Sequence, residues 1–277
     1  MKSTMTTLTF KRFNRCFGTV TGTFNNNVGS ILLSNPSKLN AMDLSMYKKI
    51  PSVVQQLTNQ SDIRVCILSG EGNKAFGAGS DISEFPMVRT GVTQANLYSK
   101  YEDEASDALC SLSYPLIAKI HGNCYGGGLN LALTADLRYC SDDATFCIPP
   151  AKLGIGYPSK LMKLLVNAIG KSNAKHLLLT SEIIDAKDAK RIGLVNGILP
   201  KQELDQYVDQ IAINITRLAP LTLLQCKLEL SIDEQDENVA KKTKKALDAY
   251  NNCNTSDDYK TGVQSFLNKR KPNFEGK

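Results

Sequence analysis

The sequence contains no tryptophan, only two histidines and no Cys-x-x-Cys pair, and none of its apolar runs approaches the ~20 residues that span a membrane. Two histidines, His121 and His176, are too few for a typical metal cluster, and we expect both to pack inside the protein. Eight single cysteines indicate neither a zinc site nor a disulfide framework, and we interpret them as buried thiols of a reducing compartment. We therefore expect no bound metal and no contact with a membrane.

A dense basic stripe interleaved with aromatic residues is also missing, which speaks against nucleic acid as a partner. The formal net charge of +6 is mild for 277 residues, and it fits a solvated basic surface or, alternatively, a polyanionic small ligand. The first 17 residues are basic and free of acids, which loosely matches a transit peptide, but the alternation in "FKRF" is more typical of a strand. We expect a cytoplasmic protein, or one of the mitochondrial matrix if the source is eukaryotic.

Strands and helices alternate along most of the chain. Residues 18–34 predict a β-hairpin with an Asn-rich turn, and residues 62–70 and 114–122 predict strands that are buried on both faces. Residues 43–60 predict a helix with Leu44, Tyr47, Val54 and Leu57 on one face, and residues 160–170 and 173–181 predict two more helices. From residue 202 onward the pattern is almost wholly helical. This order predicts an α/β core over residues 1–200 and a helical region over residues 201–277.

Two glycine-bearing turns follow buried strands and begin helices: "FGAGSDI" at residues 76–82 and "YGGG" at residues 125–128. A helix N-terminus presents unpaired N–H groups with partial positive charge. Two such turns side by side would form an oxyanion hole, in which each donor contributes about 3–4 kcal/mol of transition-state stabilisation. Ordinary turn geometry is the alternative interpretation of either stretch alone, and neither has the G-x-G-x-x-G spacing of a dinucleotide site.

Several motifs, taken in order, resemble the crotonase (enoyl-CoA hydratase/isomerase) superfamily. They are "NPSKLNAM", "KAFGAGSDISEF", "PLIAKIHGNCYGGGLNLALTADLRYCSDDATFCIPPAKLGIGYP", "DAKDAKRIGLVNGILP" and "DDYKTGVQSFLNKRKPNFEGK". The match runs from about Gly18 to the C-terminus. The resemblance implies a spiral ββα core, C-terminal helices that form a homotrimer or a hexamer of two trimers, and an acyl-CoA thioester as ligand. It implies no permanently bound cofactor, because coenzyme A arrives as part of the substrate.

The resemblance also assigns roles to residues of this chain. The main-chain N–H groups of Ser80 and Gly127 would hold the thioester oxygen, and the coenzyme A portion would contact Lys38, Ala41, Ala78, Asp81, Ile82, Phe266 and Lys269. Phe266 and Lys269 would act from the C-terminal segment, across a subunit boundary in one arrangement. The aspartate is expected to cap its helix, whereas Glu84 would substitute for a catalytic acid only if its side chain turned inward.

Two departures from the family pattern concern the chemistry. Asn130 stands where G-G-G-x-E has its glutamate, and Pro150 stands where P-E-x-x-L-G has the second one. A positioned acid or base contributes about 10²–10⁴-fold to a rate, and neither an amide nor a proline supplies it. The sequence therefore speaks against hydration by the two-glutamate mechanism.

Three hypotheses stay open at this point. The first is an acyl-CoA enzyme of the hydratase/isomerase type with rearranged acid–base groups. The second is a malonyl-type acyl-CoA decarboxylase that uses Tyr157 of "LGIGY", a tyrosine whose alternative role is to form a wall of the acyl pocket. The third is a catalytically silent acyl-CoA binder or a structural trimer subunit.

Overall fold

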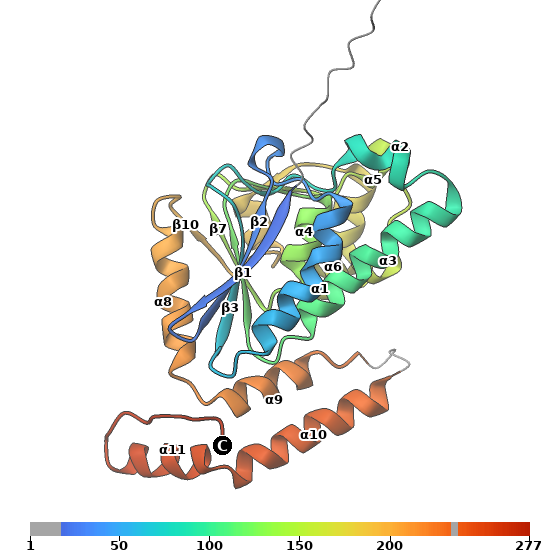
Figure 1. Ribbon diagram of the computed structural model, residues 1–277. Coiled ribbons are helices and arrows are strands. Elements are labelled where there is room, and N and C mark those ends of the chain that lie inside the picture. Colours follow the sequence, from blue (N-terminus) through green and yellow to red (C-terminus); the bar gives the residue numbers. More distant parts are fainter. Residues whose placement is uncertain (1–17, 234–237) are drawn as a thin grey trace, which may run out of the picture.

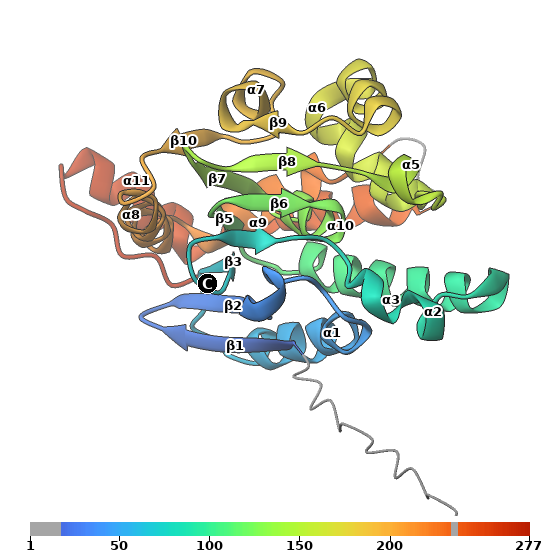
Figure 2. The same ribbon diagram turned by 90° about the horizontal axis from the view of Figure 1, so that it is seen from above.

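The computed structural model describes residues 18–233 and 238–277, and its strands form two sheets (Figures 1 and 2). The larger sheet has the order β1-β2-β3-β5-β7-β10, with β1 (Thr19–Asn25), β2 (Val28–Ser34), β3 (Val65–Gly70), β5 (Leu116–Ile120), β7 (Leu137–Ser141) and β10 (Gly197–Leu199). The smaller sheet has the order β4-β6-β8-β9, with β4 (Ala75–Gly77), β6 (Asn123–Tyr125), β8 (Thr145–Cys147) and β9 (Ile184–Asp185). Because helices connect these strands, the predicted α/β fold class is confirmed.

The hairpin at the start of the large sheet is confirmed. β1 and β2 pair antiparallel, and Asn26 and Asn27 between them adopt positive φ angles of 48° and 67°. Asparagine tolerates this conformation better than most residues, which suits a two-residue hairpin turn. The remaining pairs of the large sheet run parallel, as crossover connections through helices require.

Helices and short 3-10 turns fill the connections and the C-terminal part. They are η1 (Pro36–Lys38), α1 (Leu44–Thr58), η2 (Ile82–Glu84), α2 (Phe85–Val88), α3 (Gly91–Cys110), α4 (Gly126–Leu133), α5 (Pro150–Leu153), α6 (Ser159–Thr180), α7 (Ala186–Arg191), α8 (Leu204–Thr216), α9 (Pro220–Leu230), α10 (Val239–Thr255) and α11 (Asp257–Leu267). In α1 the predicted face is buried except for Leu44, which is only partly covered. The two helices predicted at residues 160–181 are confirmed, because α6 consists of two helical stretches that meet at Gly170, where φ is +74° and the backbone is not helical.

The large sheet is covered on both faces, with α8 on one side and α1, α3 and α4 on the other (Figure 1). Side chains of β3 alternate between these layers: Val65 and Ile67 pack with α8, while Cys66 and Leu68 join the opposite core. This explains why the strand is apolar at successive positions, as the sequence predicted.

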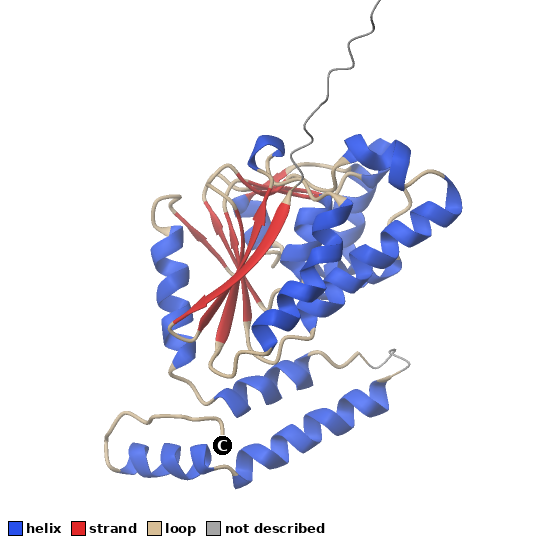
Figure 3. Cartoon of the chain, in the orientation of Figure 1, coloured by secondary structure: helices blue, strands red, loops and turns tan. Residues whose placement is uncertain are grey.

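The last three helices, α9, α10 and α11, extend beneath the sheet layers, whereas α8 packs directly on the sheet (Figure 3). Large apolar side chains on α10 and α11 are exposed, among them Leu247, Tyr250, Tyr259 and Phe266. The domain division at residue 200 and the role of the C-terminal helices in oligomerisation stay predictions. Across the described ranges, no helix combines the length and apolarity needed to cross a membrane.

Two expectations about single residue types need correction. Cys110 and Cys226 are exposed, although Cys66, Cys124, Cys140 and Cys147 are buried as expected. His176 is exposed and pairs with Glu182 at 2.9 Å, whereas His121 is buried. Cys16, the strand predicted at "FKRF" and the leader-like segment lie outside the described residues.

Candidate active site

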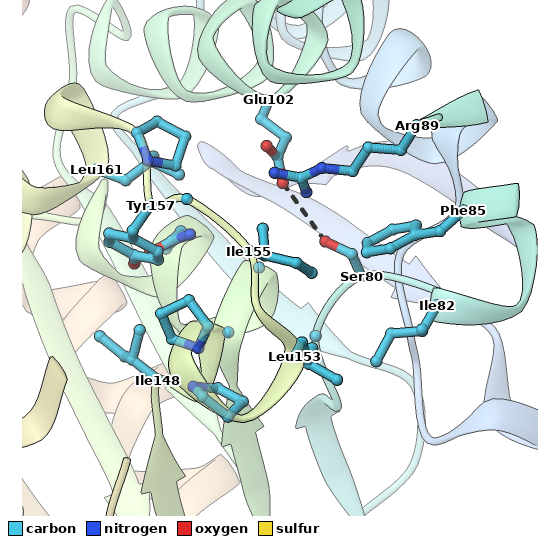
Figure 4. Close-up of a pocket in the computed structure, with 18 of the residues that line it drawn as sticks. Ser80, Ile82, Phe85, Arg89, Glu102, Ile148, Leu153, Ile155, Tyr157 and Leu161 are labelled. Carbon is cyan, nitrogen blue, oxygen red and sulfur yellow. Dashed lines mark hydrogen bonds between the residues drawn. The ribbon is translucent and has the colours of Figure 1, made fainter. Parts of the chain in front are cut away.

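A cavity of about 590 Å³ opens between the end of β4, the start of α4, the middle of α3 and the segment of residues 148–158 (Figure 4). Residues predicted from separate segments of the sequence meet in its wall: Ala78, Ser80, Ile82, Gly127, Asn130, Pro150 and Tyr157. Much of the remaining wall is apolar, with Phe85, Ile148, Leu153, Ile155 and Leu161. The cavity therefore combines a hydrophobic interior with a few polar groups, as small-molecule sites do.

The amide of Ser80 is directed by a short strand-like bridge. Ser80 pairs parallel with Met42, through two hydrogen bonds that Met42 makes with the residues before and after Ser80. Met42 N donates to Gly79 O at 2.8 Å, and Asp81 N donates to Met42 O at 2.7 Å. In such a ladder the N–H of the intervening residue points to the opposite side. The N–H of Ser80 therefore faces away from Met42.

The three glycines at the start of α4 are required by close main-chain approach. Gly126 has a positive φ of +44°, and a Cβ on Gly128 would lie 2.5 Å from Gly77 O. A Cβ on Gly127 would lie 2.1 Å from Tyr47 Oη and 3.3 Å from Ser80 N. Because Tyr125 contributes no side-chain cap, no side chain at the N-cap occupies the first-turn amides of α4. The two glycine turns are thus in contact, with Gly127 beside the Ser80 amide.

Tyr157 and Asn130 form a neutral hydrogen-bonded pair in the cavity wall. Tyr157 donates its hydroxyl proton to Oδ1 of the buried Asn130. Burial raises the pKa of Tyr157 above its ordinary value, so the phenol stays protonated at neutral pH. Pro150, at the first position of α5, lines the cavity next to them.

Sequence reasoning missed the one carboxyl group in the described cavity wall, that of Glu102 on α3. Ser80 Oγ lies 3.4 Å from Glu102 Oε1 and 3.0 Å from Tyr47 Oη, and Glu102 Oε2 is buried with no hydrogen-bond partner among the described residues. Burial raises the pKa of Glu102 to about 7, and the positive charge of Arg89 opposes this rise. Arg89 also lines the cavity, with its guanidinium over the ring of Phe85.

A signal for Glu102 is visible in the helical spacing of α3. Tyr98, Glu102, Ser106 and Leu109 are buried, three or four residues apart, on one face of the helix. A carboxylate at a position of this kind is rarely buried without a partner or a function. The spacing alone, however, does not say that this face looks into a cavity.

The two acidic residues singled out near the first glycine turn have structural partners. Asp81 caps η2 by accepting from Ser83 N, which confirms the expected cap, and it pairs with Lys38 Nζ at 2.5 Å. Desolvation alone would raise the pKa of Asp81, but hydrogen bonds from Lys38 and Ser83 bring it below its ordinary value. Glu84 accepts from Leu44 N at 2.7 Å, so its carboxylate serves the start of α1 and does not line the cavity.

Several residues assigned to coenzyme A lie outside the cavity wall. Lys38 forms an ion pair with Asp81, whose two neighbours in the sequence, Ser80 and Ile82, line the cavity. Ala41 is buried in the loop that precedes α1. Phe266 at the end of α11 is 84% exposed, and neither it nor Lys269 lines the cavity. Their coenzyme A contacts stay predictions. Among the residues of the described ranges, no three His, Cys, Asp or Glu side chains are grouped to hold a metal ion.

Comparison with known proteins identifies the family of this chain. The family model described as "Enoyl-CoA hydratase/isomerase" matches residues 23–277. The mitochondrial Delta(3,5)-Delta(2,4)-dienoyl-CoA isomerase of Dictyostelium discoideum is 33% identical over 264 residues, covering 90% of this chain and 87% of the relative. The peroxisomal enzyme of that name from Arabidopsis thaliana is 31% identical over 261 residues, covering 88% and 91%.

The solved structure of an enoyl-CoA hydratase/carnithine racemase from Magnetospirillum magneticum superimposes with a TM-score of 0.85 at 28% identity, covering 94% of this chain and 98% of the other. The family model spans both glycine turns and the C-terminal helices, and the alignments with the two relatives cover 88% and 90% of this chain. The chain therefore belongs to the enoyl-CoA hydratase/isomerase family, within the crotonase superfamily.

Proposed function

We propose that this protein is an acyl-CoA thioester enzyme that binds the thioester carbonyl oxygen between the N–H groups of Ser80 and Gly127. The observation that carries the proposal is the contact of the two glycine turns at one end of an apolar cavity, where a Cβ on Gly127 would lie 3.3 Å from Ser80 N. Two adjacent amides aimed at one oxygen suit a carbonyl that gains negative charge during a reaction.

The chemistry follows from where charge develops. Removal of a proton from the α-carbon of a thioester places negative charge on the carbonyl oxygen. Fixed main-chain dipoles stabilise that oxygen without rearranging, each contributing about 3–4 kcal/mol. The apolar side chains of the wall, such as Phe85 and Leu161, exclude water from the acyl group and strengthen these interactions.

The remaining parts of the ligand suit the surroundings. Lys38 and the C-terminal residues Phe266 and Lys269 would contact the coenzyme A portion, which enters with the substrate, so no resident cofactor is needed. A homotrimer or homohexamer built through α10 and α11 would cover the apolar side chains exposed there. Localisation in the cytoplasm or the mitochondrial matrix stays a prediction. The two dienoyl-CoA isomerases are named as peroxisomal and mitochondrial enzymes, and these names concern the relatives alone.

Decarboxylation by Tyr157 is less well supported than proton transfer at the α-carbon. A phenol that protonates an enolate must direct its O–H at the substrate, but Tyr157 donates its proton to Asn130. The apolar wall and the neutral Tyr157–Asn130 pair offer no cation for a substrate carboxylate on that side. Arg89 lines the opposite side, next to Glu102.

The oxyanion proposal is tested by infrared difference spectroscopy of a saturated acyl-CoA labelled at its carbonyl. We expect the carbonyl band to move to lower frequency on binding, because two donors polarise the bond. Gly127→Ala, whose added Cβ would meet Tyr47 Oη at 2.1 Å, should abolish the shift. Gly156→Ala is the matched control, because a Cβ there meets open space in the same cavity. An unshifted band in the bound wild type would refute the proposal and leave a silent binder.

A further inference from the structure

We propose that Glu102 is the acid–base residue of this site and carries a single proton between two carbons of a bound enoyl thioester. The reaction is then the migration of a carbon–carbon double bond, not the addition of water. This inference rests on the proposed function, since it requires the thioester oxygen to be held at Ser80 and Gly127. None of the comparisons assigns a role to Glu102, and it lies at neither position where the family motifs carry glutamate.

Position is the first support. Glu102 belongs to α3, which contributes one wall of the cavity, and its carboxyl group points toward Ser80 (Figure 4). Ser80 Oγ donates to Glu102 Oε1 at 3.4 Å, and the amide of the same serine belongs to the proposed oxyanion hole. A carboxyl beside the carbonyl oxygen is also near the α-carbon, which is bonded to the carbonyl carbon. The base and the oxyanion donors therefore converge on one end of the acyl group.

The state of the carboxyl group is the second support. Glu102 is 6% exposed, and its Oε2 has no hydrogen-bond partner among the described residues. A buried carboxyl that served only the fold would be expected to have both oxygens paired, because an unpaired one costs about 1–3 kcal/mol. An unpaired oxygen in the wall of a cavity is free to exchange a proton with a ligand.

The charged and titratable groups around Glu102 keep both of its protonation states accessible. Burial raises the pKa of its carboxyl to about 7, Arg89 and the hydrogen bond from Ser80 lower it, and Asp103 on the same helix raises it. Three phenols also interact with Glu102: Tyr47 on α1, Tyr98 on α3 and Tyr157 in the cavity wall. Burial raises the pKa of each, so all three are neutral.

One carboxyl group is sufficient for a double-bond shift. The carboxylate of Glu102 removes a proton from the α-carbon of a 3-enoyl thioester, and the electron pair of that C–H bond delocalises onto the carbonyl oxygen and the γ-carbon. The protonated Glu102 then returns the proton to the γ-carbon, which leaves the double bond between the α- and β-carbons and regenerates the carboxylate. The substrate and the product are isomers and Glu102 returns to its initial state, so the reaction needs neither water nor a cofactor.

Water addition places a different demand on the cavity. The attacking water needs its own base, and the α-carbon needs a proton donor. The positions of both family glutamates are taken by Asn130 and Pro150, and Glu102 is the only carboxyl in the described cavity wall. The geometry thus favours a reaction in which one group first accepts and then donates the same proton.

The test compares wild type with Glu102→Gln, Glu102→Asp and the matched control Glu104→Gln, which alters a half-exposed glutamate on the same helix. Conversion of a 3-enoyl-CoA to the conjugated 2-enoyl-CoA is followed by ultraviolet absorbance. Exchange of α-protons of a saturated acyl-CoA in deuterated water is followed by mass spectrometry, and its binding by calorimetry. Glu102→Gln should lose about 10²–10⁴-fold in both rates and keep its affinity within about threefold.

Two readouts separate catalysis from a structural role. The wild-type rate should rise with pH through a midpoint near 7, a limb that Glu102→Gln should lack and Glu102→Asp should partly restore. The control Glu104→Gln should behave as wild type. A fully active Glu102→Gln, or a wild type that binds acyl-CoA without exchanging protons, would overturn the role of Glu102 alone. A wild type that does not bind acyl-CoA would overturn the proposed function and this inference together.

Discussion

Replacing Glu102 by glutamine should stabilise the fold above neutral pH. The pKa of this carboxyl is raised by burial from an ordinary 4.5 to about 7, so the folded state binds more protons than the unfolded state between these values. Wild-type stability should therefore fall as pH rises through this window and level off above it. At 1.36 kcal/mol per pKa unit, the full penalty is on the order of 3 kcal/mol. Glutamine carries no charge, so this penalty is absent from the variant.

The measurement is urea unfolding of both proteins at a fixed concentration, from pH 5 to pH 9. The difference in unfolding free energy between Glu102→Gln and wild type should grow with pH in favour of the variant, approaching ~3 kcal/mol above pH 8. Glu104→Gln, on the same helix but half-exposed, should follow the wild-type curve. Parallel curves for wild type and Glu102→Gln would mean that the carboxyl is not desolvated, and the reasoning about its proton would fail.

Three further substitutions probe the surroundings. Arg89→Met removes the charge that lowers the pKa of Glu102, so the midpoint of the pH–rate profile should move up by about one pH unit, as measured by initial rates across pH. Tyr157→Phe should cost about 1–2 kcal/mol in urea unfolding, because Asn130 loses a buried hydrogen bond; a loss of about 10²-fold in turnover would instead indicate a catalytic phenol. Lys38→Ala should raise KM for acyl-CoA several-fold with little change in kcat, because Lys38 is proposed to contact coenzyme A. The melting temperature should change little, because the ion pair with Asp81 is half-exposed on the lysine side. An unchanged KM would remove Lys38 from the binding site.

The contact of the two glycine turns could be predicted from sequence because it is made of main chain. Glycines at residues 126–128 indicate a positive φ angle and a close approach of main chain, and both can be inferred from a few consecutive residues of the sequence. The cavity residues Asn130 and Tyr157 could be named for the same reason, through short motifs. Their mutual hydrogen bond could not, because it joins positions 27 residues apart.

Glu102 and Arg89 could not be assigned to the site from sequence. Their positions depend on how α3 and the loop after α2 lie across the cavity, which is a tertiary arrangement. The same holds for Glu84, whose carboxylate was a candidate acid and instead accepts from Leu44 N, 40 residues away. The spacing of buried residues along α3 indicates a buried face, but the helix alone does not reveal what that face meets.

The contact between Gly128 and the carbonyl of Gly77 fixes the separation of α4 from β4 by backbone alone. Because this spacing involves no side chain, substitutions elsewhere in the cavity wall should leave the contact of the two glycine turns in place. In the proposed reaction, the carbonyl-binding end of the site and its acid–base residue are therefore separate parts, and only the second depends on which helix supplies a carboxyl group.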